Sequence, residues 1–328
     1  MRSLNKISLY LLVPVWVFLA ACSSPVERQA AATTSVTVFE GARLIIGDGG
    51  ALIENSAFIV ENNQFTRVGR RGEVQAPAGA RRVDLSGKTV MPTLSDLHGH
   101  FGFQNVAAGT MSKQSFTREN LIAHLERLAY VGVGAVVGVG DLVDRAEPNG
   151  GRTGWGDVPL RVRDEIIPNA ALFRTAGPGM AWPGSGAQGH ASRVDVSYPV
   201  TMVAEARTAV QDYIRIKPEF IKIWVDSRGG RKPTLTPPLY RAIIDEAHKY
   251  NVPVAVHNVT LADAKELMRA GIDGWLHVPV RAGEVADDEL IAIVKSRVAR
   301  NERPNMWMTP ALTTSWMNTH GGQHPAWL

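Results

Sequence analysis

Short apolar runs alternate with amphipathic segments from residue 89 to about residue 312, and this alternation restricts the possible folds more than any other feature. The run at 132–140 (GVGAVVGVG) is apolar throughout, as in a strand that is buried on both faces. Just before it, residues 118–130 place three leucines on one helical face. Apolar strands that alternate with helices predict βα units around a parallel sheet.

Seven strands are predicted in this region. The first ends at His98, and the others cover residues 132–140, 170–175, 220–225, 252–257, 272–278 and 306–312. A TIM-type (β/α)8 barrel closes with eight strands and carries its active site at their carboxyl ends. The expectation is therefore an α/β barrel over 89–328 with about seven strands present. Three alternatives stay open for the eighth: a longer protein supplies it, a partner chain supplies it, or the fold differs.

Residues 35–88 have a different pattern, with alternating strands and turns. Val36 and Val38 alternate with threonine, and Asn62-Asn63 is a hairpin signal between two apolar runs. This stretch predicts a small β unit that forms part of a β-sandwich ahead of the barrel.

Two histidines end the first barrel strand. His98 and His100 stand two residues apart, so on an extended strand both side chains point to one face, where they can hold one metal ion. The lead-in AGARRVDLSGKTVMPTLSDLHGH resembles the amidohydrolase superfamily, whose members share the pattern DxxGKxVxPGxxDxHxH. Thr93 replaces the usual glycine of that pattern. The positions that match are Asp84, Gly87, Lys88, Pro92, Asp96, His98 and His100.

Three further candidate ligands close apolar runs in chain order. Lys222 lies within FIKIWVD, His257 ends AVH and His277 ends GWLH. This succession resembles the branch of the superfamily related to imidazolonepropionase and Xaa-Pro dipeptidases. The resemblance implies that His98 and His100 hold one metal, that His257 and His277 hold another, and that a carboxylated Lys222 bridges them if the site is binuclear.

The residue chemistry favours zinc or a similar divalent ion, one or two per chain, because neutral imidazoles and a carbamate oxygen suit such ions. A metal-activated water would then hydrolyse a C–N bond in an amide, lactam or dipeptide. The resemblance also implies a proton-shuttling aspartate after strand eight, which no residue of this sequence matches. The catalytic residue is therefore unassigned, and the alternative is a non-catalytic or truncated lipoprotein that retains only a metal- or ligand-binding pocket.

Four other residues near the predicted site have weaker signals. His190 follows a Gly- and Pro-rich loop and Arg228 lies on a mouth-side loop, so both are candidates for substrate binding. Asp226 and Asp141 follow strands four and two and are candidates for a substitute base; the alternative for each is a loop cap or an ion pair.

The first 21 residues are typical of a bacterial secretory signal, with Arg2 and Lys6 ahead of an apolar stretch. The leader ends in Leu-Ala-Ala-Cys, which predicts lipidation of Cys22, the single cysteine. Residues 22–34 then form a tether. The absence of aspartate after Cys22 favours the outer membrane, facing the periplasm. A formal net charge of +4 without a basic cluster argues against nucleic acid as a partner, and the oligomeric state is left open.

Overall fold

The computed structural model describes residues 36–187, 191–280, 283–300 and 306–311, and the chain divides after Pro92 into two compact units. The predicted leader, the tether, Cys22 and His190 lie outside the described residues. Among the residues that are described, no helix is long and apolar enough to cross a membrane.

The first unit is built on a four-stranded sheet of order β4-β3-β1-β5, in which only β1 and β5 run parallel. Asn62 and Asn63, both with positive φ, form the turn between β3 and β4, as predicted. A sandwich stays a prediction, because β2 and β6 form only a separate two-stranded sheet. The strands are β1 (Thr37–Glu40), β2 (Arg43–Leu44), β3 (Ser56–Glu61), β4 (Gln64–Arg70), β5 (Arg81–Asp84) and β6 (Thr89–Val90).

The second unit contains nine parallel strands among its described residues, in two sheets of order β7-β8-β9 and β11-β10-β12-β13-β14-β15. Seven of them match the predicted strands, and β10 and β11 are short additions. Over the described parts of residues 93–311, no strand pair joins β15 to β7, so a closed barrel is not established. The strands are β7 (Leu94–Gly99), β8 (Val133–Gly138), β9 (Leu172–Thr175), β10 (Met180–Ala181), β11 (Tyr198–Pro199), β12 (Ile221–Trp224), β13 (Val254–His257), β14 (Gly274–Leu276) and β15 (Trp307–Thr309).

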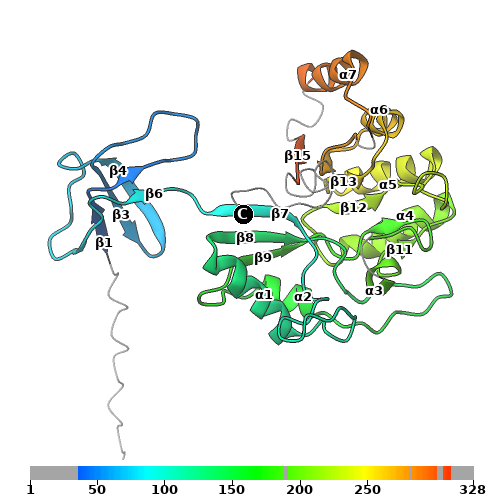
Figure 1. Ribbon diagram of the computed structural model, residues 1–328, viewed down its shortest axis with the longest axis horizontal. Helices are drawn as coiled ribbons and strands as arrows, with labels where there is room; N and C mark the ends of the chain where they lie inside the picture. Colours follow the sequence, from blue (N-terminus) through cyan, green and yellow to red (C-terminus); the bar gives the residue numbers. More distant parts are fainter. Residues whose placement is uncertain (1–35, 188–190, 281–282, 301–305, 312–328) are drawn as a thin grey trace, which may run out of the picture. The chain divides into compact units, whose positions relative to one another are not determined.

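Helices follow the strands as the sequence predicts, and Figure 1 shows α1 and α2 beside β8 and β9. Thr117 and Thr260 cap α1 and α6, each accepting a hydrogen bond from a backbone N–H of the first turn. Gly271 ends α6 with φ 97°, a left-handed conformation in which glycine has no steric penalty. The helices are α1 (Arg118–Tyr130), α2 (Val158–Arg163), α3 (Ala191–Val194), α4 (Val203–Ile214), α5 (Pro237–Lys249), α6 (Leu261–Ala270) and α7 (Asp288–Ala299).

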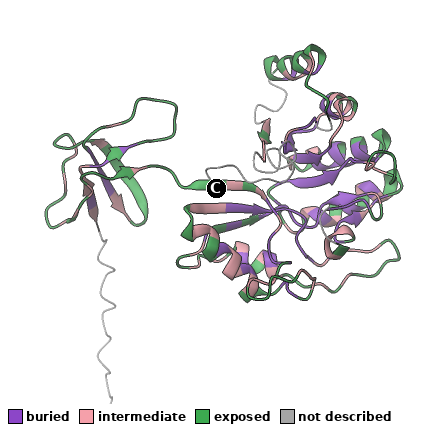
Figure 2. Cartoon of the chain, in the orientation of Figure 1, coloured by how far each residue is buried: buried purple, intermediate pink, exposed green. Residues whose placement is uncertain are grey.

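Strands β12 and β13 are buried on both faces, as their colour in Figure 2 shows. Ile221 and Ile223 belong to the large apolar core that includes α4, α5 and α6. Since side chains alternate along a strand, Lys222 and Trp224 face the opposite side, away from these helices. The register pairs Trp224 with His257, which places the end of β13 beside the end of β12. The strand period thus directs Lys222 to the inner face of the sheet.

Candidate metal centre

The structure brings the predicted histidines together at the carboxyl ends of the parallel strands. His98 lies on β7, His257 ends β13 and His277 directly follows β14. The ring centroid of His98 is 5.5 Å from that of His100 and 5.8 Å from that of His277. The ring centroids of His257 and His277 are 4.5 Å apart. Four imidazoles from three strand ends thus form one contiguous group.

Lys222 is buried beside these rings. Its side chain is fully buried, and its Nζ lies 5.2 Å from the Trp224 ring centroid. Its positive charge contributes to lowering the pKa of His98, His100 and His257. The lysine predicted between the two histidine pairs therefore acts electrostatically on both.

Burial keeps these histidines neutral. Desolvation is the largest cause in each case, and it lowers the pKa of His98 far below its usual range, that of His100 to about 3 and that of His257 to about 4. A metal ion binds imidazole in the neutral form, so these side chains are in the protonation state that ligation requires at pH 7.

Hydrogen bonds to the far sides of two rings determine which nitrogen carries the proton. The Nε2 of His257 is 3.1 Å from Oδ2 of Asp226, and the Nδ1 of His277 is 3.1 Å from the carbonyl oxygen of Val278. Both oxygens can only accept, since several hydrogen bonds hold the pKa of Asp226 at about 2. The His257 imidazole therefore donates from Nε2, which leaves a lone pair on its Nδ1.

The imidazoles of His257 and His277 lie within hydrogen-bond distance of each other. Nδ1 of His257 and Nε2 of His277 are 2.7 Å apart, and the tautomer of each ring decides which of the two nitrogens donates. His277 has φ 104°, a conformation that a side chain other than glycine adopts only under strain and that often marks a functional site. The donor set thus fits a divalent ion chemically. In the described part of the chain, however, no three His, Cys, Asp or Glu side chains are arranged to hold one ion.

Asp226 and Arg228 contact each other. Arg228 donates from its guanidinium to Asp226 Oδ2 at 2.8 Å and to the carbonyl oxygen of Gly186 at 2.8 Å. Asp226 also holds His257, so its described contacts are those of a histidine partner, and a role as substitute base stays a prediction. The same holds for substrate binding by Arg228, whose described contacts are within the chain.

Asp141 is fully buried after β8 and accepts a hydrogen bond from the Thr175 hydroxyl at 2.5 Å. Desolvation raises its pKa to about 7, although the Thr175 hydrogen bond opposes the change. The described contacts of Asp141 are with neighbouring strand ends, and its role as a base is likewise untested.

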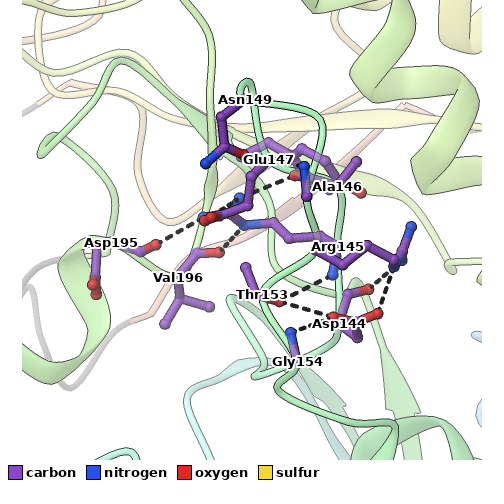
Figure 3. Close-up of polar contacts among 12 residues, drawn as sticks. Asp144, Arg145, Ala146, Glu147, Asn149, Thr153, Gly154, Asp195 and Val196 are labelled. Atoms are coloured by element: carbon purple, nitrogen blue, oxygen red, sulfur yellow. Dashed lines mark hydrogen bonds and ion pairs between the residues drawn. The ribbon is translucent and has the colours of Figure 1, made fainter.

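Sequence reasoning missed Arg193 on α3, whose charge contributes to the low pKa of His100. Figure 3 shows how this segment is held: the buried guanidinium of Arg145 donates to the carbonyl oxygens of Asp195 and Val196 at 3.2 and 3.0 Å. The neighbouring Asp144 accepts from Thr153 and Gly154 and so closes the loop 144–154, which carries Arg145. The sequence signal that could have identified Arg193 is a basic residue three positions after His190, which ends the Gly- and Pro-rich loop.

No protein-family model matches the sequence, and a search of the curated proteins found no significant match. Solved structures do match. A Xaa-Pro dipeptidase with bound methionine has TM-score 0.62 and 22% identity over 83% of this chain and 71% of its own. An amidohydrolase has TM-score 0.62 and 19% identity over 89% and 70%. The A. niger ochratoxinase has TM-score 0.64 and 17% identity over 88% and 68%.

These structural neighbours are members of the amidohydrolase superfamily, which confirms at the level of fold the resemblance predicted from the sequence. At such identities, the likeness establishes the fold and leaves the reaction to be argued from the site.

Proposed function

We propose, on the premise of this amidohydrolase fold, that the protein is a metal-dependent hydrolase acting on a C–N bond in an amide, a lactam or a dipeptide. The observation that carries the proposal is the group of four imidazoles at the strand ends, His98, His100, His257 and His277, in which neighbouring ring centroids lie 4.5 to 5.8 Å apart. Neighbours described as prolidase, ochratoxinase and molinate hydrolase support a hydrolytic reaction.

In this proposal His98 and His100 hold one ion, His257 and His277 hold a second, and Lys222 lies between them, carboxylated if the site is binuclear. A zinc or similar ion held by these residues would supply Lewis-acid chemistry, polarising the scissile carbonyl and lowering the pKa of a water molecule toward about 7. Burial of the histidines keeps them neutral and ready to ligate at that pH.

Two features of the chain serve the reaction directly. The strand ends hold the rings on rigid elements, which fixes the site geometry better than loops would. Arg193 carries a positive charge that helps to keep His100 neutral. The residue that carries the proton to the leaving group is not assigned.

The test is elemental metal analysis of the protein purified with bicarbonate, beside Lys222→Ala and His257→Ala. We expect one to two ions per chain, falling in both variants, and amide or dipeptide hydrolysis that falls with them. Folded protein without metal would contradict the proposal. Metal without hydrolysis would favour the second candidate, a lipoprotein that binds a ligand but does not catalyse.

We also propose that the protein is anchored in the bacterial cell envelope by a lipid on Cys22, most simply in the outer membrane facing the periplasm. The motif that ends in Cys22 supports this location. Cys22→Ser should move the protein out of the membrane fraction, and retention there would contradict the anchor.

A further inference from the structure

The hydrogen bond between His257 and Asp226 sets the orientation of a proposed metal ligand. We propose that Asp226 is a positioning residue, which fixes His257 in the tautomer whose Nδ1 faces the metal position. The inference rests on the proposed function for the identity of the ion, but the tautomer itself is a property of the chain without metal.

The carboxylate of Asp226 is held at both oxygens. Oδ2 receives His257 Nε2 at 3.1 Å and the Arg228 guanidinium at 2.8 Å, while Oδ1 receives the backbone N–H of Arg228 at 2.8 Å. The Asp226 backbone N–H in turn donates to Thr234 Oγ1 at 2.9 Å. A carboxylate bound at both ends cannot rotate, so it presents one oxygen to His257 in a fixed direction.

Arg228 extends this support away from the ring. Its backbone has φ 57°, and its guanidinium donates to the Gly186 carbonyl oxygen as well as to Asp226. The side chains of Asp226, His257 and Arg228 are only 5%, 10% and 16% exposed, so water competes weakly for these charge-assisted hydrogen bonds. The chain of contacts runs from Gly186 through Arg228 and Asp226 to His257.

His257 and His277 have different partners on the other side of the ring. Nδ1 of His277 lies beside a neutral carbonyl, that of Val278, whereas Nε2 of His257 donates to an ionised carboxylate. A carboxylate partner both fixes the ring and increases the basicity of the opposite nitrogen, and its loss typically lowers metal affinity about 10- to 100-fold. Asp226 should therefore control ligation by His257 more strongly than the carbonyl controls ligation by His277.

A second Asp–His pair in the protein provides a matched control. His248 Nε2 lies 2.8 Å from Asp273 Oδ2, and Asp273 also accepts from the backbone N–H of Val254. Val254 begins β13 and Asp273 immediately precedes β14, so this pair lies at the opposite strand ends from His257 and His277. His248→Gln replaces the ring of this second pair without touching the site.

The experiment measures the ring nitrogen shifts of 15N-labelled histidines by NMR in the metal-free protein, with the His257 signals assigned by His257→Gln. We expect His257 to carry its proton on Nε2 in the wild type and to lose this preference in Asp226→Ala. Asp226→Asn, which keeps an acceptor oxygen but not the charge, should fall between them. His248→Gln should leave the His257 signals unchanged.

Zinc affinity, measured by competition with a chelator, is the second readout. We expect it to fall about 10- to 100-fold in Asp226→Ala, less in Asp226→Asn, and not at all in His248→Gln. If Asp226→Ala does not fold, Asp226→Asn decides the question by both readouts. An unchanged His257 tautomer in the folded variants would overturn the proposal, as would an unchanged zinc affinity. A wild type that binds no zinc but shows the fixed tautomer would overturn the proposed function and leave the positioning role of Asp226 standing.

Discussion

Asp141 makes the fold of the second unit sensitive to pH, and replacing it with asparagine tests this directly. Burial raises the pKa of Asp141 from its ordinary value of 3.8 to about 7 in the folded protein. Between these two values the folded state keeps the proton and the unfolded state has lost it. Stability is therefore fully present below about pH 4, falls as the pH rises to about 7, and levels off above that.

The size of the effect follows from the two pKa values. Their separation of about 3 pH units corresponds to about 4 kcal/mol of unfolding free energy, or about 1.4 kcal/mol per pH unit between pH 4 and pH 7. Asparagine is neutral throughout and can still accept the hydrogen bond from Thr175. We expect Asp141→Asn to match the wild type near pH 4 and to be more stable by about 4 kcal/mol at pH 7.5.

The assay is urea unfolding at a series of pH values, followed by tryptophan fluorescence. This signal reports on the second unit, because residues 36–92 contain no tryptophan while the described residues of the second unit contain several. They are Trp155, Trp182, Trp224, Trp275 and Trp307. Taking the difference between variant and wild type at each pH cancels the titration of all other groups that the substitution leaves unchanged.

Thr175→Val provides a second, independent variant. It removes the hydroxyl whose hydrogen bond lowers the pKa of Asp141, so the fall in stability should extend to higher pH than in the wild type. A stability difference between Asp141→Asn and wild type that does not change from pH 4 to pH 7.5 would refute the reasoning, because an unburied or ion-paired carboxylate would then be indicated.

Three further substitutions test the packing that supports the site. Arg145→Met should cost about 2–3 kcal/mol in urea unfolding, because it leaves the carbonyl of buried Val196 and that of Asp195 without their donor; a loss below 0.5 kcal/mol would contradict this. Gly271→Ala should cost about 1 kcal/mol by thermal unfolding, since a Cβ is strained at φ 97°, and no loss would contradict it. Leu121→Ala should cost about 3 kcal/mol, because this side chain lies on the buried face of α1 and is fully buried. A change near zero would mean that α1 does not pack as described.

The sequence predicted the order and type of the elements in the second unit well. The helix at 118–130 is found at the predicted residues, because it combines an apolar face with a threonine cap. The strands are shorter than predicted, most clearly at 274–276, since apolar residues continue into the loop after the ladder ends. Periodicity marks burial, and burial extends beyond the hydrogen-bonded strand.

The grouping of His98, His100, His257, His277 and Lys222 was also predictable, because parallel strands bring their carboxyl ends to one edge of a sheet. The contacts that surround them were not. The Asp226–His257 pair joins residues 31 apart in the sequence, and the Arg145 contacts to residues 195 and 196 join residues 50 and 51 apart. Spacing along one strand says which side chains share a face, but loop conformations decide which distant groups meet them.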